Sequence, residues 1–333
     1  MIPEDKRNVV KRALEEAFGV SELEDIRMIT IGLSSALIFR IVVKGKAYLL
    51  RIITRTDDVS DPTHYFGSMK MGADAGLAPR IWCLNNEERI SITDFIEPHP
   101  FPIDVARAQL PVTLKQLHAL PPFARRVNWL EFVDNCVKKI KDGQILPAPF
   151  TAELFERYAT VASVYPRDSA DWVSCHNDLK PENIMYDGNR PWLVDWEAAF
   201  LNDRYMDLSI IANFVVRNDE EEDAYLHNYF GTTASENQRA RFFLMQQILH
   251  MSYFSFMLLI VSRAQHPIDP EMPRRGFREY HDRMWAGEID LAKNEARMEY
   301  AWVHMDRLLQ NLRSKRLEES LRVLRASRKG AKP

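Results

Sequence analysis

The chain has 333 residues, of which 46% are hydrophobic and 27% are charged, proportions typical of a globular protein with one large core or two smaller lobes. Its formal net charge of −3 gives no general attraction to polyanions, so neither nucleic acid nor an anionic membrane is expected as a partner. The three cysteines are widely spaced and odd in number, which argues against a zinc site and a disulfide framework and favours a reducing cytoplasm.

The first part of the chain predicts a small antiparallel sheet. Residues 1–19 read as a charged amphipathic helix without the apolar centre of a signal peptide, so secretion is not expected. Residues 29–41 read as strand, turn and strand, and residues 46–52 as a third strand. Residues 92–97 read as one more strand, and the proline-rich stretch 98–102 ends this part of the chain. We therefore expect an N-terminal lobe built mainly from strands.

The remainder predicts a larger, mainly helical lobe, with the boundary between residues 1–97 and residues 98–333. Residues 105–120 carry apolar side chains on one face and predict an amphipathic helix. Residues 242–261 are apolar over the length that a bilayer needs, but Gln, His and Ser interrupt them, so we expect a buried helix and no membrane span. The predicted fold class is α+β with two lobes.

The most informative segment is Cys-His-Asn-Asp-Leu-Lys-Pro-Glu-Asn at residues 175–183. It contains a His-x-Asp pair, His176 and Asp178, and an amide, Asn183, five residues after the acid. A second acid, Asp195, follows after the next predicted strands. This order of groups is typical of kinases and predicts phosphoryl transfer. We expect His176 to brace the loop rather than to react.

Residues 184–186 and 192–194 read as two short strands of a hairpin. Because antiparallel pairing places positions equidistant from the turn side by side, Asn183 and Asp195 are expected to face each other. An amide oxygen and a carboxylate, together with nucleotide phosphate oxygens, suit Mg²⁺. Asp178 is left as the group that accepts the proton of the attacking hydroxyl.

The sequence after Asp195 argues against a protein kinase. Trp196 and Glu197 stand where protein kinases have Phe-Gly, and no Ala-Pro-Glu triplet closes an activation segment. Only nine residues separate this motif from Asp207, too few for a peptide-binding activation loop. The predicted substrate is therefore small.

The run from Leu193 to Ser209 resembles the aminoglycoside phosphotransferase and choline kinase superfamily, and looks most like the choline and ethanolamine kinases, including the bacterial LicA type. The resemblance implies a protein-kinase-like two-lobed fold with ATP and Mg²⁺ as cofactors. It implies that Asp178 is the catalytic base and that Asn183 and Asp195 are metal ligands. It also implies that Asp207 braces the loop, although Asp207 also suits an exposed helix N-cap.

In the small lobe the resemblance implies a turn that closes over the nucleotide phosphates. Members of the family carry several glycines there, whereas this chain has only Gly32, with Ser34 and Ser35 as further donors to phosphate oxygens. Arg51 occupies the third-strand position where kinases place a lysine, and its charge is expected to face the nucleotide.

The helix before Gly76 is expected to supply an acid that pairs with Arg51. It contains no glutamate, and the spacing does not choose between Asp61 and Asp74. Asp94 and Ile96, on the strand that leads into the hinge, are expected to lie against the nucleotide, with backbone groups meeting the adenine ring.

On the acceptor side, choline kinases hold a quaternary ammonium group among aromatic rings. Tyr253 and Phe256 stand where tryptophans are expected on a helix after the metal motif, although an aromatic stripe at helical spacing also suits a core. Glu197 is predicted to orient an amine or hydroxyl of the acceptor. The acidic run 219–223 suits either a solvated face or attraction of a cation.

The sequence thus predicts a cytoplasmic, ATP-dependent kinase that transfers the γ-phosphoryl group to a hydroxyl of a small cationic alcohol such as choline or ethanolamine. An aminoglycoside phosphotransferase and a nucleotide-binding pseudokinase without turnover are the alternatives. The sequence does not indicate an oligomeric state.

Overall fold

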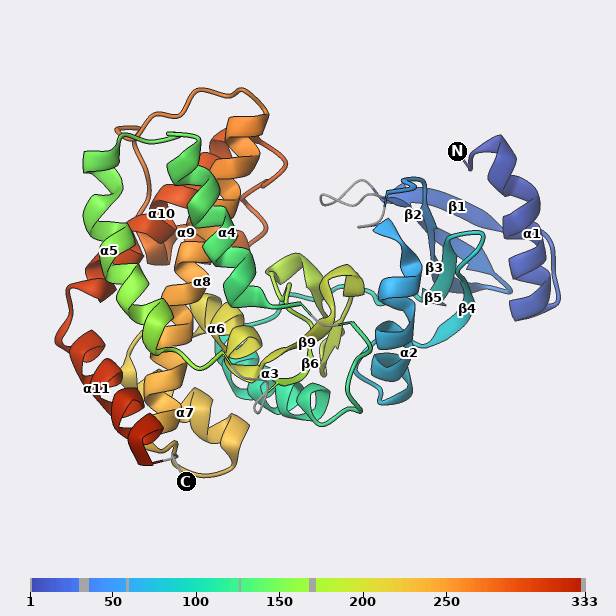
Figure 1. Cartoon of the computed structure of the whole chain (residues 1–333). Helices are drawn as coiled ribbons and strands as arrows, with labels where there is room; N and C mark the ends of the chain where they lie inside the picture. Colours follow the sequence, from blue (N-terminus) through green and yellow to red (C-terminus); the bar gives the residue numbers. More distant parts are fainter. Residues whose placement is uncertain (1, 30–35, 58–59, 126, 168–171, 331–333) are drawn as a thin grey trace.

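The computed structural model describes residues 2–29, 36–57, 60–125, 127–167 and 172–330. Figure 1 shows these residues as two lobes, with a sheet lobe at the N-terminal end of the chain and a larger helical lobe toward the C-terminal end. The predicted phosphate-binding residues Gly32, Ser34 and Ser35 lie outside the described residues.

The small lobe contains a five-stranded sheet in the order β1-β2-β3-β5-β4, with every neighbouring pair antiparallel. The strands are β1 (Asp25–Ile29), β2 (Ala36–Val43), β3 (Lys46–Ile53), β4 (Ile81–Asn85) and β5 (Ile90–Asp94). Sequence patterns predicted the central strands and missed β4. Helix α1 (Glu4–Phe18) covers one face of the sheet, where Val10 and Leu14 pack with Phe39 and Leu50.

Alternation along β3 decides which side chains face the large lobe. Leu50 and Ile52 are fully buried in the core under α1. Because successive side chains of a strand point to opposite faces, Arg51 points to the other face of the sheet, toward the catalytic loop.

The large lobe is built around one long helix, α8 (Glu236–Arg263), which packs against α4, α5, α6, α10 and α11. The other helices are α2 (Phe66–Asp74) between the lobes, and α3 (Ile103–His118), α4 (Trp129–Asp142), α5 (Ala148–Val164), α6 (Arg204–Val215), α7 (Asp219–Phe230), α9 (Phe277–Trp285), α10 (Asn294–Leu312) and α11 (Lys315–Gly330). By length and composition α8 is the one described helix able to cross a membrane, but 72% of its most apolar window is buried inside the protein. Its hydrophobic side chains are therefore accounted for by the core.

Two short strand pairs lie where the lobes meet. β6 (Trp172–Cys175) pairs with β9 (Phe200–Asp203), and β7 (Ile184–Tyr186) pairs with β8 (Pro191–Leu193). In this second hairpin Ile184 lies opposite Leu193, so Asn183 comes opposite Val194, whose amide donates to the Asn183 carbonyl at 3.0 Å. The prediction that Asn183 directly faces Asp195 was wrong by one residue.

The reason lies in the turn of that hairpin. The carboxylate of Asp187 accepts hydrogen bonds from the amides of Asn189 and Arg190, which draws these residues into the turn and shifts the start of β8 to Pro191.

The α+β fold class, with a small antiparallel sheet lobe and a larger, mainly helical lobe, is confirmed. The sheet and α1 have a core of their own, whereas the buried residues of α2 belong to the large core. The division at residue 97 stays our proposal for the lobe boundary.

Candidate active site

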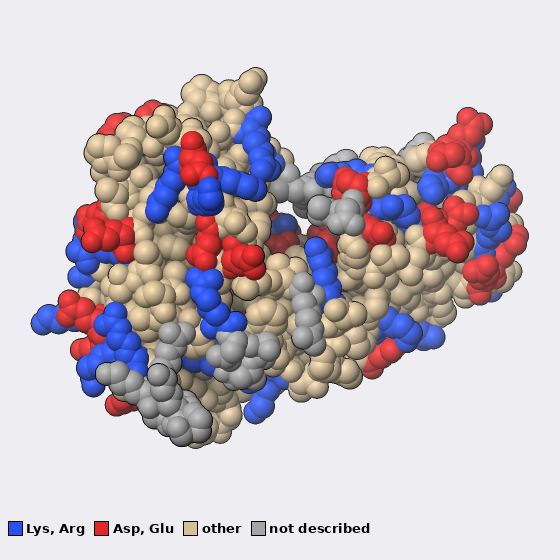
Figure 2. All heavy atoms as spheres, viewed as in Figure 1, with Lys and Arg blue, Asp and Glu red and all other residues tan. Residues whose placement is uncertain are grey.

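The predicted catalytic residues meet between the two lobes. Figure 2 shows that the surface is hollowed there, with charged side chains of both signs at the bottom of the notch. β6 leads into the loop that carries His176 and Asp178, and the one-turn helix η3 (Pro181–Asn183) ends it. The motif at Asp195 follows directly after β8.

The loop turns at Asn177, whose φ of 65° lies in the left-handed region that asparagine tolerates better than most residues. The amides of His176 and Asn177 donate to the two carboxylate oxygens of Asp207 at 2.9 and 2.7 Å. The Asn177 side chain donates to the carbonyl of Ala198 at 3.1 Å and accepts from the amide of Asn202 at 2.8 Å. The conformation of the loop is thus fixed by hydrogen bonds to one acid and to the strand β9.

Asp207 is fully buried inside α6, and Asp203 caps that helix by accepting from the amide of Tyr205. The alternative that Asp207 is an exposed N-cap was therefore wrong. Its position behind the loop is the one that the family resemblance implied, and its bracing role stays our proposal.

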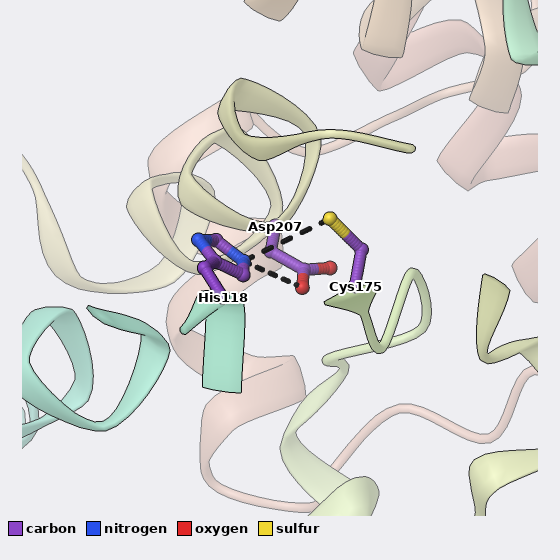
Figure 3. Close-up of side chains that lie close together, drawn as sticks. All are labelled: His118, Cys175 and Asp207. Carbon is purple, nitrogen blue, oxygen red and sulfur yellow. Dashed lines mark hydrogen bonds and ion pairs between the residues drawn. The ribbon is translucent and has the colours of Figure 1, made fainter. Parts of the chain in front are cut away.

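A second contact reaches Asp207 from α3, as Figure 3 shows. Nε2 of His118 lies 3.2 Å from Oδ2 of Asp207, and Nδ1 lies 2.7 Å from the hydroxyl of Tyr229. Since a carboxylate oxygen only accepts, Nε2 carries the proton and Nδ1 accepts from Tyr229. His118 thereby links the buried acid to α7.

His118, Cys175 and Asp207 have the side-chain types of a metal site, and their ligand atoms lie within 4.8 Å of one another. Both oxygens of Asp207, however, already accept hydrogen bonds from backbone amides. Burial raises the pKa of the Cys175 thiol well above its usual value, which keeps it protonated and a poor ligand. The cluster is best explained as support for the loop.

Asp178 is half-buried, and its carboxylate is held from two directions. Oδ2 accepts from the amide nitrogen of Asn183 at 2.8 Å and pairs with Nζ of Lys180 at 3.2 Å. Desolvation raises the pKa of Asp178 above the usual aspartate value, with the nearby charge of Asp195 adding to the rise and Lys180 opposing it. A base with a raised pKa is better matched to accepting a proton near neutral pH.

Arg51 crosses from the small lobe to the second acid of the motif. Its Nη1 lies 3.0 Å from Oδ1 of Asp195, and its Nη2 forms a close hydrogen bond with Oε1 of Glu197. Burial alone would raise the pKa of Asp195, but Arg51 outweighs it and the pKa is lowered. Asp195 therefore stays ionised in the site.

The structure identifies the acidic partners of Arg51, which the sequence spacing did not determine. Asp61 caps its own short helix by accepting from the amide of Thr63, and Asp74 pairs with Lys70 at 2.6 Å. Neither pairs with Arg51, whose acidic partners come from the large lobe.

Asp195 has a φ of 61°, a second left-handed residue in the site. The neighbouring side chains hold it there: His176 is fully buried, with Nε2 2.9 Å from the carbonyl of Val194 and its ring 5.0 Å from the ring of Trp196. Trp196 also packs against α2 of the small lobe. A Cβ atom on Gly72 would lie 2.5 Å from Cη2 of Trp196, so only glycine permits this approach.

The oxygen atoms of the motif fit a divalent cation. The amide nitrogen of Asn183 is used by Asp178, which leaves its oxygen for a ligand, and Arg51 uses only Oδ1 of Asp195. One amide oxygen and one carboxylate oxygen, completed by phosphate oxygens and water, is a set that Mg²⁺ accepts.

The two residues predicted at the hinge, Asp94 and Ile96, lie at the end of β5 and just after it. The Asp94 side chain accepts from Lys46 and from Nε1 of Trp82, both at 2.9 Å. Asp94 pairs directly with Tyr48 in the sheet, so its side chain shares the face opposite to Arg51. Ile96 is half-buried in the segment between β5 and α3. Both stay predictions as nucleotide contacts.

The two aromatic residues predicted for the acceptor site lie on α8. Tyr253 is half-buried, with its ring 5.2 Å from Tyr300 and 4.8 Å from His304. Burial raises the pKa of the Tyr253 hydroxyl, and the charge of Asp178 adds to the rise. Phe256 lies one turn further along α8, is 40% exposed and packs near Phe132. The structure does not bring the two rings together.

Behind Tyr253 lies a group of three buried histidines, His250, His281 and His304. Nδ1 of His250 lies 2.9 Å from Nδ1 of His304, and Nδ1 of His281 lies 2.8 Å from the carbonyl of Phe277. Burial lowers the pKa of all three, to about 3 for His281. They are therefore neutral at physiological pH.

Sequence analysis missed Lys180 and Tyr300. Lys180 stands two residues after Asp178 within the motif, so its position could have been used. Tyr300 could not be found, because it is on α10 and reaches Tyr253 only through the packing of α8 against α10.

A model of the phosphotransferase enzyme family matches residues 72–243, just over half of the chain, and includes Asp178, Asn183 and Asp195. The chain belongs to this family. The predicted resemblance to the aminoglycoside phosphotransferase and choline kinase superfamily is thus confirmed.

The phosphotransferase is similar in sequence to Protein LicA of Haemophilus influenzae, with 37% identity over 59 residues, which are 18% of this chain and 22% of that protein. The match thus spans about a fifth of the curated relative.

Among solved structures, a choline/ethanolamine kinase family protein from Mesorhizobium loti matches with a TM-score of 0.65 and 17% identity over 96% of this chain and 99% of that chain. A spectinomycin phosphotransferase in complex with ADP and spectinomycin matches with a TM-score of 0.54 and 14% identity, covering 89% of this chain and 98% of that chain. At these identities the likeness shows the fold, which is that of the protein-kinase-like phosphotransferases.

Proposed function

We propose that this phosphotransferase moves the γ-phosphoryl group of ATP to the hydroxyl of a small cationic alcohol such as choline or ethanolamine, in the cytoplasm. The observation that carries the proposal is the place of Asp178. Its Oδ2 accepts from Asn183, its pKa is raised by burial and by the charge of Asp195, and its own charge adds to the burial that raises the pKa of the Tyr253 hydroxyl. A base between a phosphate-binding side and an aromatic side suits transfer to a hydroxyl group.

In this proposal Asp178 accepts the hydroxyl proton as the oxygen attacks. Lys180, 3.2 Å from Asp178, faces the transferred phosphoryl group and stabilises its charge, while Arg51 holds Asp195 and Glu197 and contacts the nucleotide phosphates. Mg²⁺, held by Asn183 and Asp195, supplies charge neutralisation of the phosphates when it is bound. Transfer then depends mainly on positioning and electrostatics.

The acceptor site is proposed beside Tyr253 and Tyr300. A cation is attracted to the faces of aromatic rings, and Glu182 lies close enough to Tyr300 to help raise the pKa of its hydroxyl, after the larger effect of burial. Glu197, predicted to orient the acceptor, has its carboxylate bonded to Arg51, so we now propose that it anchors that arginine. Phe256 is proposed only as a rim residue.

The aminoglycoside alternative draws on the fold shared with the spectinomycin phosphotransferase and needs a wide acidic cleft. The acidic run 219–223 does not supply one. It forms the first turn of α7, where Glu222 pairs with Arg316, Asp223 with Arg239, and Glu221 lies 3.1 Å from Arg107. Charges neutralised in this way give little attraction to a polycationic substrate.

The test is ATP consumption with Mg²⁺ in the presence of choline, ethanolamine or one of several aminoglycosides, with Asp178→Asn as the matched blank. Asparagine keeps the shape of the side chain but cannot accept the proton. Turnover with choline or ethanolamine that falls by about 10²–10⁴-fold in the variant is expected. Turnover with aminoglycosides alone would overturn the acceptor assignment, and ATP binding with no turnover for any acceptor would favour a pseudokinase.

A further inference from the structure

A polar pocket lies in the helical lobe and contains none of the residues proposed for phosphoryl transfer, although His250 in its wall also belongs to the histidine group behind Tyr253. Its volume is about 200 Å³, and it lies where α6, α8 and α10 meet the start of α7 and the start of α11. We call it the arginine pocket, because Arg217, Arg307 and Arg316 line it; Asn213 and His250 lie in its wall as well.

Two acids, Asp219 and Glu222, also line the arginine pocket, and both lie beside Arg316 and not beside Arg307. Arg316 forms a close ion pair with Glu222, and Nη2 of Arg217 lies 3.0 Å from Oδ1 of Asp282. Arg307 is half-buried, and its contacts in the described part of the chain are Oε1 of Gln310 at 3.2 Å and the ring of Phe277 at 5.3 Å. No carboxylate among the described residues pairs with it. Burial, with repulsion from Arg316, lowers the pKa of Arg307.

Asn213 gives a second, independent observation. It is 4% exposed, it lines the same pocket from α6, and its Nδ2 is buried with no hydrogen-bond partner among the described residues. A buried donor without an acceptor costs about 1–3 kcal/mol. A surplus guanidinium and an unpaired amide donor in one small pocket both call for an acceptor that carries negative charge.

We propose that the arginine pocket is a binding site for a phosphate group, as free phosphate or as a small phosphate monoester, with Arg307 as its charge partner and Asn213 as an amide donor. Guanidinium groups bind phosphate through directed, charge-assisted hydrogen bonds. The pocket is smaller than the about 300–1,000 Å³ typical of sites for drug-sized ligands, so the ligand is an ion or a small ester and not a nucleotide. The proposal does not depend on the proposed kinase activity.

The experiment is calorimetric titration of the full-length protein at constant ionic strength, with inorganic phosphate, glycerol phosphate and acetate as probes. Saturating Mg²⁺ and a non-hydrolysable ATP analogue occupy the nucleotide site throughout. The variant is Arg307→Met, which keeps most of the apolar stem, and the control is Arg322→Met, at an exposed arginine on α11. Arg307→Lys and Asn213→Ala complete the set, and circular dichroism checks that each is folded.

Wild type and Arg322→Met are expected to bind phosphate equally, Arg307→Met to bind it at least tenfold more weakly, and Arg307→Lys to lie between them. Binding of glycerol phosphate as well as free phosphate identifies the monoester as a possible source of the group, and binding of free phosphate alone identifies the ion. Absence of phosphate binding by wild type would overturn the proposal. So would equal affinity of Arg307→Met, or acetate binding as tightly as phosphate.

Discussion

The two groups of residues around Asp178 differ in charge. On one side, Arg51 from the small lobe joins Asp195 and Glu197 from the large lobe, so that full charges meet across the interface. On the other side, Tyr253 packs on Tyr300 and on histidines that burial keeps neutral. The first side is set by a few strong electrostatic contacts, whereas the second is set by the packing of uncharged rings.

This difference predicts how each group of residues responds to substitution and to protonation. A charged network fails when one ion is removed, because the remaining charges are left without a partner in a partly buried place. A neutral aromatic side tolerates single changes better, but it is sensitive to protonation of its histidines.

The largest effect is expected at Asp195. Asp195→Ala removes a proposed metal ligand and the partner of Arg51, and we expect turnover to fall by about 10³-fold or more with little change in secondary structure. Measurement of kcat together with circular dichroism checks this. A folded variant with unchanged ATP turnover would remove the charged side from the reaction.

The next largest effect is acid destabilisation of the aromatic side. The pKa values of His250, His281 and His304 are lowered in the folded protein, so below about pH 6.5 the unfolded chain binds protons that the native state does not. Stability from these groups is present above pH 6.5 and is lost as the pH falls toward the folded values. Each histidine costs on the order of 1 kcal/mol per pH unit, which amounts to a few kcal/mol for the group at pH 5.5.

Urea unfolding at pH 7.5, 6.5 and 5.5 measures this loss. His281→Phe is expected to remove about a third of it, while the exposed His227→Phe is expected to leave it unchanged. A free energy of unfolding that stays constant down to pH 5.5 would show that the histidines are not held neutral.

Arg51 gives a smaller effect on the charged side. Arg51→Met leaves Asp195 and Glu197 side by side without their cation, and we expect a loss of about 10–100-fold in kcat/KM for ATP and about 1–3 kcal/mol in stability. Arg51→Lys keeps the charge but lacks the planar guanidinium whose two terminal nitrogens each bond one acid, so it should fall between Met and wild type. Arg27→Met, at an exposed arginine of the same sheet, serves as the control, and a loss in it as large as in Arg51→Met would contradict the assignment.

The smallest effect is expected on the aromatic side and separates its two predicted residues. Tyr253→Leu should raise the acceptor KM about five- to thirtyfold, in line with about 1–2 kcal/mol for a cation at a ring face, with the KM for ATP unchanged. Phe256→Leu should change either constant less than threefold, because Phe256 lies on the exposed side of α8. Equal effects at both positions would restore the original pairing of these rings.

The catalytic motif could be predicted from the sequence, because its residues are close along the chain. His176, Asp178, Asn183 and Asp195 lie within twenty residues, so their spacing identifies the motif, although Asp207 and β9 fix the loop in the structure. The strands of the small lobe and the helix after residue 102 were predictable for the same reason, since alternation and helical spacing are local patterns.

Contacts made by distant segments were not predictable. The partners of Arg51 were sought on the helix before Gly76 and come instead from positions 144 and 146 residues away. The pairing of Tyr253 with Tyr300 and of His118 with Asp207 depends on how helices pack. No spacing rule in one sequence encodes such packing.

The contact between Gly72 and Trp196 links the position of α2 to the position of the Asp195 carboxylate. The ring that α2 rests on belongs to the residue directly after Asp195, so a shift of α2 would press on or release the peptide that positions this carboxylate. An added methyl group at position 72 would overlap the ring of Trp196 and push α2 away from it. The placement of α2 and the alignment of the Asp195 carboxylate therefore depend on the same ring contact.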